Sequence, residues 1–409
     1  MDNNIMKSPG QGWLIFFLLL AVASAMAFIP AVNHNVAAGM HSLTSAKGAV
    51  APVNDQIGTI YDTLKYGRSI HILAMLLVGF GLLMVFVRKH GYSSITATFL
   101  AVSIALPLYV LVRSYGSGSF GAPVISIDTL LLAEFAAASL LIAIGAPLGR
   151  LRMEQYFIMA LLFIPVYMLN EWLILESGLF NGFLDTGGSV VIHAFGAYFG
   201  LGVVTGTMKL FQDAPGAESD AVSNQFALLG SMILWIFWPS FTSALVAPER
   251  VVLTAINTIF ALCGATVATY IFSRLIRGKI EIADVANAAL AGGVAIGSAC
   301  NMTNPGYALC IGLAAGALST LGYTVIAPKV ELIIKGSDTC GVHNLHGMPG
   351  ILGGLTAIIV TGAAGVQLLG IVVTVVLAFI GGKITGFILN LLGTKAVPYS
   401  DEEEFILAE

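Results

Sequence analysis

Long apolar stretches dominate the chain, and short polar breaks that contain charged residues, Gly, Pro or Asp separate them. A transmembrane helix needs about 20 mostly apolar residues, and twelve of the stretches come close to or exceed that length. They are 10–30, 68–90, 93–113, 126–148, 153–173, 188–210, 223–245, 249–272, 284–302, 305–327, 343–362 and 367–392. A β-barrel would instead show short segments of alternating hydrophobicity. The pattern predicts an all-α, polytopic membrane protein with 11–12 transmembrane helices.

The composition supports this fold class. Hydrophobic residues make up 57% of the 409 residues and charged residues only 10%, against about 25% charged residues in ordinary soluble domains. This excludes a soluble globular enzyme, a disordered chain and a nucleic-acid-binding domain, and a net charge of −4 offers no surface for a polyanion. The four cysteines show no paired spacing, so we expect no disulfide framework.

The first apolar stretch, within residues 1–30, has two interpretations. Lys7, the apolar run 13–23 and the small residues at 25–27 are typical of a secretory signal peptide with its cleavage site. The stretch nevertheless continues to Pro30, which is long enough for an extra N-terminal helix that is retained. The sequence leaves both interpretations open.

Charge placement predicts the orientation. When all twelve stretches are kept as helices, twelve Lys and Arg residues lie on the side of the N-terminus and five on the other side. The positive-inside rule then places both termini in the cytoplasm. We expect the chain to lie in the inner (plasma) membrane of the cell. Residues 31–67 are expected to form an outer loop, and 393–409 a short cytoplasmic tail.

Two stretches repeat the same chemistry. Asp185 precedes His193 by eight residues, and Asp338 precedes His346 by eight residues, with small residues following each histidine. The two stretches are five spans apart and therefore enter the membrane from opposite faces. This is the signature of an inverted repeat, which in transporters has the functional site at the interface between the repeats.

The spacing also predicts where the two histidines lie. Each Asp is a candidate helix N-cap, and eight helical residues rise about 12 Å. In a hydrocarbon core about 30 Å thick, helices that start at opposite faces bring the two histidines to within roughly 6 Å in depth. We expect a facing histidine pair near the midplane. A single intramembrane histidine can also be a packing residue, but two at matching positions favour function.

Other histidines carry weaker signals. His343 lies near the start of its helix and is expected in a solvated vestibule, while His34, His41, His71 and His90 are expected in loops or at helix ends. Together with His343 and His346, Cys340 forms a ligand set that also suits zinc or copper. No HExxH or CxxC pattern accompanies it, so we predict neither a metal nor a cofactor.

Four runs are distinctive: VIHAFGAYFGL at 191–201, FWPSFTSA at 237–244, NAALAGGVAIG at 287–297 and DTCGVHNLHGMPGILGG at 338–354. Together they resemble the Rh (Rhesus) branch of the ammonium transporter (Amt/Mep/Rh) family. The lack of long loops and of a long tail resembles a bacterial member. The resemblance implies a homotrimer in which each subunit forms its own central pore from two inverted five-helix repeats and one further helix. The corresponding ranges are 68–210, 223–362 and 367–392.

The resemblance also implies roles for the residues of the pore. His193 and His346 match the twin histidines that line the pore and share a hydrogen bond between their rings. Phe135, in AEFAAAS, and Phe241, in WPSFTSA, match two stacked phenylalanines that close its outer side. From the sequence alone, either phenylalanine would be interpreted as ordinary packing.

Acidic residues complete the expected site. Asp185 matches a residue that shapes the site, with Asp338 as its structural counterpart in the repeat, and Glu171, in LNEW, matches an acidic residue of the outer vestibule. Without the resemblance, Glu171 would be a solvated loop residue. Thr242 stands where relatives have asparagine, and the aromatic ammonium-binding platform of the Amt branch is not found, so high-affinity capture of the cation is not implied.

These features predict a channel or transporter for ammonia, not an enzyme. A bare cation in an apolar tube costs many kcal/mol in desolvation, so we expect ammonium to lose its proton at the outer mouth and to cross as ammonia. The expected partners are ammonium or ammonia and, in an alternative that stays open, carbon dioxide. A membrane metalloprotein is a minor alternative, and no nucleic acid is expected to bind.

Overall fold

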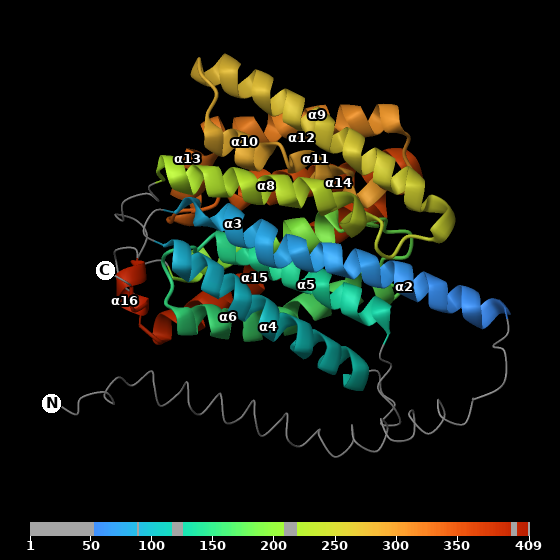
Figure 1. The fold of residues 1–409 in the computed structure, drawn as a ribbon, viewed down its shortest axis with the longest axis horizontal. Helices are drawn as coiled ribbons and strands as arrows, with labels where there is room; N and C mark the ends of the chain where they lie inside the picture. Colours follow the sequence, from blue (N-terminus) through green and yellow to red (C-terminus); the bar gives the residue numbers. More distant parts are fainter. Residues whose placement is uncertain (1–52, 88–89, 117–125, 208–218, 394–398, 408–409) are drawn as a thin grey trace. The chain divides into compact units, whose positions relative to one another are not determined.

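Helices dominate the described part of the chain in the computed structural model (Figure 1). The structure describes residues 53–87, 90–116, 126–207, 219–393 and 399–407, and no strand occurs among them. Ten helices within these ranges are long and apolar enough to cross a membrane. This confirms the prediction of a polytopic all-α membrane protein. The expected signal peptide or helix at 1–30 lies outside the described residues.

The first half of the chain contains the helices α2 to α7, together with π-helical and 3₁₀ turns at several of their ends. The helices are α2 (Val53–Ala74), α3 (Gly81–Leu83), α4 (Gly91–Gly116), α5 (Ile127–Gly145), α6 (Met153–Glu171) and α7 (Phe195–Gly206). π-helical turns at Met75–Phe80, Trp172–Glu176 and Ser189–Ala194 extend α2, α6 and α7, and a 3₁₀ turn, Met84–Phe86, follows α3.

The second half follows a similar plan. Its helices are α8 (Ala221–Thr242), α9 (Val251–Arg277), α10 (Ile282–Ala288), α11 (Ala291–Ile296), α12 (Pro305–Leu321), α13 (Ala327–Ile334) and α14 (Met348–Thr361), followed by α15 (Ala364–Leu391) and the short α16 (Asp401–Glu404). π-helical turns at Gly322–Ile326 and His343–Gly347 precede α13 and α14, and 3₁₀ turns lie at Pro248–Arg250 and Gly297–Ala299.

The eleven predicted spans from 68–90 onward, which fall largely in the described part of the chain, match these helices except at a few ends. Residues 53–67, expected in the outer loop 31–67, form the first turns of α2. The apolar residues of this segment recur at helical spacing between polar ones, as in an amphipathic helix. The segment therefore contains no continuous apolar run and was not predicted as part of a membrane span. The span expected at 305–327 continues through α13 to Ile334.

The chain divides into two compact units. The smaller one comprises residues 1–64 and 114–124, of which the structure describes the first turns of α2 and the last turn of α4. The larger one comprises residues 65–113 and 125–409 and contains every residue discussed below.

Loops from the two halves exchange backbone hydrogen bonds in a reciprocal way. The loop before the helix of His193 bonds to the turn after α11, and the loop before the helix of His346 bonds to the end of α5. The four bonds run from Thr186 N to Ser298 O, Gly187 N to Gly297 O, Thr339 N to Ala146 O and Cys340 N to Gly145 O. Reciprocal contacts of this kind are expected when two halves are related by an inverted repeat.

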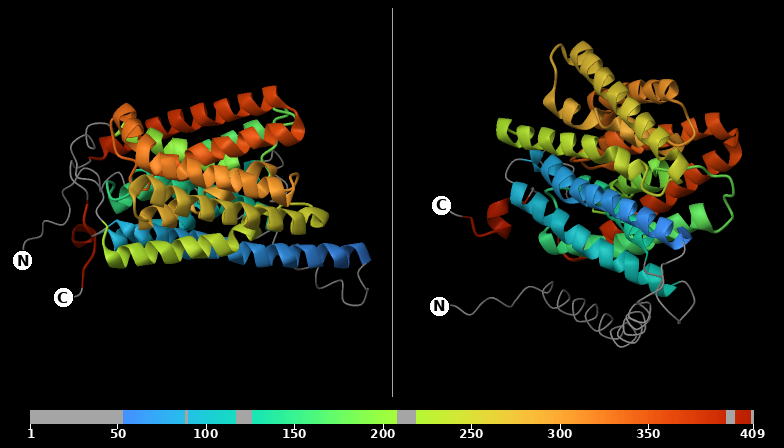
Figure 2. Two further views of the ribbon diagram at one scale, coloured as in Figure 1. Left: turned by 90° about the horizontal axis from the view of Figure 1, so that it is seen from above. Right: turned by 45° about the vertical axis from the view of Figure 1, so that its right-hand side comes forward.

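Glycine allows two pairs of helices to approach closely. In the pair α7 and α15, a Cβ added at Gly382 would overlap the carbonyl oxygen of Phe199. In the pair α9 and α12, a Cβ at Gly312 would overlap the carbonyl oxygen of Ala261. Figures 1 and 2 show α9 and α12 lying side by side. Small residues are the usual means of close helix packing in membranes.

The C-terminal segment is bonded to the start of α4. The carboxylate of Asp401 accepts hydrogen bonds from Tyr92 N at 3.0 Å, Ser93 N at 2.9 Å and Ser93 Oγ at 2.7 Å. The Phe405 ring lies 6.2 Å from the ring of Tyr92. Asp401 therefore satisfies amide donors that the first turn of α4 leaves free, and it fixes the C-terminal segment on the body of the protein.

Candidate functional site

A row of aromatic rings crosses the centre of the larger unit. The ring centroids of Phe135 on α5 and Phe241 on α8 lie 4.6 Å apart. Phe241 is 6.0 Å from His193, His193 is 5.2 Å from His346, and His346 is 6.5 Å from Phe80. All five side chains are buried. The row brings together residues from both halves of the chain.

The two histidines meet edge to edge. Their Nδ1 atoms are 3.2 Å apart and their ring planes differ by only 6°, so one ring donates to the other and the tautomers decide which one is the donor. His193 and His346 are 3% and 5% exposed. Each belongs to a π-helical turn, Ser189–Ala194 or His343–Gly347, and such turns are frequent at functional sites.

Buried aspartates hold the starts of both histidine-bearing helices. Asp185 accepts from the backbone N–H of Val190 and Val191, the latter at 2.7 Å, and from Ser298 Oγ at 2.5 Å. Asp338 accepts from the backbone N–H of Val342 and His343, both at 2.9 Å. The aspartates thus act as caps, although from further upstream than a standard N-cap.

The electrostatics of the two aspartates follow from their burial. Desolvation raises the pKa of Asp185 and raises the pKa of Asp338 to about 6, while the hydrogen bonds from the helix starts oppose the rise. Asp185 has the side-chain donor Ser298, and no side-chain donor to Asp338 is found among the described residues. The two caps are therefore alike in position and unequal in strength.

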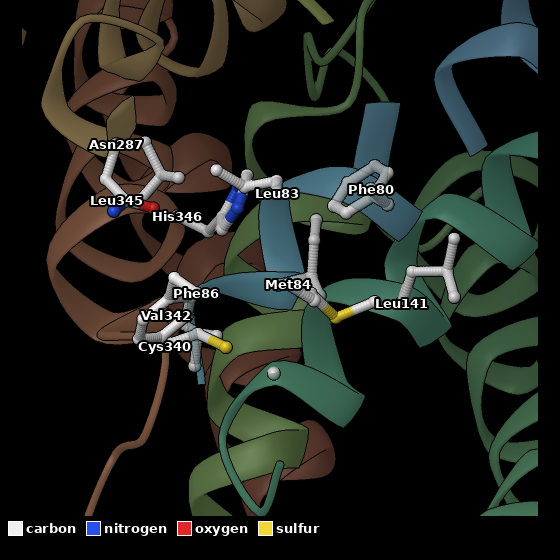
Figure 3. A pocket seen from close by; sticks show the side chains of 12 residues that line it. Phe80, Leu83, Met84, Phe86, Leu141, Asn287, Cys340, Val342, Leu345 and His346 are labelled. Atoms are coloured by element: carbon white, nitrogen blue, oxygen red, sulfur yellow. The ribbon is translucent and has the colours of Figure 1, made fainter. Parts of the chain in front are cut away.

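An apolar pocket continues the row beyond His346. Figure 3 shows the imidazole of His346 and the ring of Phe80 in one part of this pocket, and Cys340 and Phe86 in another. The remaining lining is almost entirely apolar: Leu83, Met84, Leu141, Ile142, Gly145, Val342 and Leu345, with Asn287 as a polar exception. Two polar groups therefore accompany His346 in this pocket, the thiol of Cys340 and the amide of Asn287.

Two aromatic residues next to the histidine pair were not singled out in the sequence. Trp238 stacks on His193 at 5.6 Å, with the ring planes 18° apart, and Phe80 lies beyond His346. Trp238 Nε1 and His193 Nε2 are both buried without a hydrogen-bond partner among the described residues. Neither aromatic residue has a spacing or polar signature; Trp238 lies inside the run at 237–244 that carries the family resemblance.

Glu171 is not the solvated loop residue that the sequence alone suggested. It ends the regular part of α6, is 3% exposed, and accepts a hydrogen bond from Tyr109. The carboxylate of the neighbouring Glu176 instead pairs with Arg113 at 2.6 Å. Among the described residues, no hydrogen bond or ion pair joins Glu171 to the row of rings.

His343 is half-buried and packs edge-on against Tyr198, with the ring centroids 5.7 Å apart. Its Nδ1 is buried and lacks a partner in the described part of the chain, so the ring is less solvated than the vestibule position predicted. No group of three or more His, Cys, Asp or Glu side chains in the described ranges has the geometry to hold a metal ion.

Comparisons with known proteins show the family of the chain. Residues 58–406 match the family model described as Ammonium Transporter Family. The chain is 35% identical over 424 residues to the ammonium transporter Rh type B of Homo sapiens, covering 95% of this chain and 90% of that protein. Against the protein of the same name from Oryctolagus cuniculus it is 39% identical over 370 residues, covering 82% and 80%.

Solved structures give the same result. Rh50 of Nitrosomonas europaea, from the Rhesus protein family of channels, superposes with a TM-score of 0.82 at 54% identity, covering 86% of this chain and 94% of that one. A Sensor Amt Protein shares the fold, with a TM-score of 0.74 at 22% identity over 86% and 98% of the two chains. The chain belongs to the ammonium transporter family, in its Rh branch.

Proposed function

We propose that this member of the family conducts neutral ammonia along the row of rings from Phe135 and Phe241 to Phe80. Ammonium arrives at the outer mouth, transfers its proton to water on the outer side of the two phenylalanines, and crosses as ammonia past His193 and His346. The single observation that carries this proposal is the buried histidine pair between apolar rings, with 3.2 Å between the Nδ1 atoms.

The dryness of the row selects the neutral species. Transfer of an unpaired ammonium ion into surroundings of aromatic and aliphatic side chains costs far more than transfer of a neutral amine. Aromatic faces do attract cations at partly solvated positions, so the outer face of the phenylalanine pair suits ammonium while the inner side does not. The proton therefore stays outside the row.

Hydrogen-bonding groups in and beside the row can replace the hydrogen bonds to water that ammonia gives up on entering it. Ammonia donates through its N–H groups and accepts through its lone pair. Trp238 Nε1 is a free donor and His193 Nε2 is a free ring nitrogen, both unpartnered among the described residues. The two tautomers of the histidine pair can exchange, so the pair can present either a donor or an acceptor to a passing molecule.

Glu171, Asp185 and Asp338 act around the row. The two aspartates fix the helix starts that carry the histidines, and Glu171 contributes negative charge toward the outer end, where cations are recruited. The chain assembles as a homotrimer in the inner membrane with its C-terminus in the cytoplasm, as the excess of Lys and Arg on that side and the family relationship suggest.

Carbon dioxide is the alternative cargo, because it is neutral and needs no recruiting charge. Stopped-flow fluorescence on proteoliposomes with an internal pH dye separates the two. Ammonia uptake raises the internal pH, and carbon dioxide uptake lowers it. We expect faster alkalinisation than in empty liposomes after an ammonium pulse; acceleration of acidification alone would contradict the proposal.

A further inference from the structure

Two side chains of α2 bond to the residues that directly precede the outer pair of rings. Ser69 Oγ donates to Glu134 Oε1 at 2.5 Å, and His71 Nδ1 hydrogen-bonds with Ser240 Oγ at 2.9 Å. Glu134 immediately precedes Phe135, and Ser240 immediately precedes Phe241. One turn of α2 is therefore bonded next to both phenylalanines, although α5 and α8 come from different halves of the chain.

Neighbouring contacts strengthen the same connection. Lys65 Nζ lies 2.6 Å from the carboxylate of Asp128, near the start of α5. Arg68 Nη1 donates to the carbonyl oxygen of Ala244, just beyond α8, at 3.5 Å. The ring of His71 stacks on Phe237 of α8 at 4.9 Å. Through these contacts, this part of α2 fixes the position of α5 relative to α8.

Glu134 gives the strongest reason to assign a function. The residue is 0% exposed, and its second carboxyl oxygen is buried without a partner among the described residues. A buried acidic group with few hydrogen bonds is costly, and ionisable residues inside membrane helices are rare and ordinarily functional. The residue does not belong to the row of rings, so the proposed conduction path does not explain it.

We propose that Ser69, Glu134, His71 and Ser240, here called the α2 clasp, are positioning residues that hold the Phe135 and Phe241 rings in contact and so set the size of molecule that passes. The inference rests on the proposed function, because it takes the two rings as the outer constriction. The clasp acts through the backbone. A shift of Glu134 or Ser240 moves the adjacent phenylalanine with its helix.

The test compares ammonia with methylamine, which is larger by one methyl group. Both permeabilities are measured by stopped-flow alkalinisation of proteoliposomes. In Ser69→Ala and Ser240→Ala we expect the methylamine-to-ammonia ratio to rise about fivefold, the factor that one ordinary hydrogen bond corresponds to. Glu134→Gln keeps an oxygen that accepts from Ser69, so its ratio is expected to stay within about twofold of the wild type.

A double variant separates action through the rings from a general structural effect. In a Phe135→Ala background the constriction is already open, so adding Ser69→Ala is expected to leave the ratio unchanged, which is non-additive coupling. Thr98→Val is the matched control, because this buried hydroxyl donates to the carbonyl oxygen of Ser94 in its own helix and contacts none of the clasp residues by a hydrogen bond in the described part of the chain. Its ratio is expected to equal that of the wild type.

The outcomes distinguish the two proposals. Wild-type proteoliposomes without protein-dependent ammonia flux would overturn the proposed function and the clasp with it. Normal wild-type flux with unchanged ratios in Ser69→Ala and Ser240→Ala would overturn the clasp alone. If Ser69→Ala does not assemble, Ser240→Ala decides the question, because Ser240 is half-buried and its loss leaves no buried carboxyl unpaired.

Discussion

The Nδ1 atoms of His193 and His346 lie 3.2 Å apart, although 153 positions separate the two residues in the chain. Each histidine follows a loop that is hydrogen-bonded to the opposite half of the molecule. The distance between the rings therefore depends on two long-range connections. Disturbing either loop is expected to disturb the pair.

The first prediction concerns the unequal aspartate caps. Asp185→Ala removes the acceptor for two backbone donors and for Ser298 Oγ, whereas Asp338→Ala removes it for two backbone donors only. We expect the free energy of unfolding to fall by about 3 kcal/mol in Asp185→Ala and by about 2 kcal/mol in Asp338→Ala, because buried donors are left unpaired. Thermal unfolding of the purified protein in detergent measures both. A larger loss for Asp338→Ala would contradict the ranking.

The second prediction concerns the contact between α7 and α15. A Cβ at Gly382 would overlap the backbone of Phe199, which a side-chain adjustment cannot relieve, so Gly382→Ala is expected to destabilise the fold by about 3 kcal/mol or more. Gly365→Ala is the control on the same helix, since an added Cβ there meets nothing within 4 Å. Thermal unfolding should separate the two variants, and equal melting temperatures would refute the close contact.

The third prediction concerns the C-terminal segment. Asp401→Ala leaves Tyr92 N, Ser93 N and Ser93 Oγ without their acceptor. We expect the free energy of local unfolding of the C-terminal segment to fall by about 1–3 kcal/mol. Hydrogen exchange should then accelerate at 91–94 and at 399–405. Glu402→Ala changes an exposed carboxylate on the same short helix and should leave exchange as in the wild type. Unchanged exchange in Asp401→Ala would show that the segment is held by other contacts.

The fourth prediction concerns pH and follows from His90, which is 1% exposed between α3 and α4. Burial lowers the pKa of His90 to about 4, while the charge of Asp401 opposes the shift. The unfolded chain then binds a proton near pH 6.5 that the folded protein takes up only near pH 4. The contribution of neutral His90 to the free energy of unfolding is therefore fully present above pH 6.5. It falls as the pH drops toward 4, by up to about 3 kcal/mol.

His90→Leu removes this titration. Its melting temperature relative to the wild type should rise as the pH is lowered from 6.5 to 4, and the difference should stay constant above pH 7. A constant difference in melting temperature between His90→Leu and the wild type from pH 4 to above pH 7 would show that His90 does not cause the loss of stability.

Sequence reasoning located the histidine pair because its signal is a repeated spacing. Asp185 and Asp338 stand eight residues before His193 and His346, and two helices that start at opposite faces of a bilayer of known thickness bring such residues together. The fold class was predictable for a similar reason, since helix length and hydrophobicity are fixed by the membrane. Phe135 and Phe241 were singled out only through the family resemblance.

The remaining residues depend on contacts between helices, which no local pattern encodes. Trp238 and Phe80 look like packing residues in the sequence, and only the fold places them beside the histidines. His71 was placed near a helix end because the predicted span began at residue 68, whereas α2 begins at Val53. Glu134 was overlooked because its partner, Ser69, lies 65 residues away in the chain.

Under the proposed function, ammonia conduction depends on the buried histidine pair. The most direct test is stopped-flow alkalinisation of proteoliposomes containing the wild type, His193→Ala or, as an inert control, Thr98→Val, each checked for equal protein content. Loss of the imidazole leaves an apolar gap without hydrogen-bonding groups, so we expect ammonia flux in His193→Ala to fall by about tenfold or more, with the control unchanged. Ammonia flux in His193→Ala equal to that of the wild type would contradict the account.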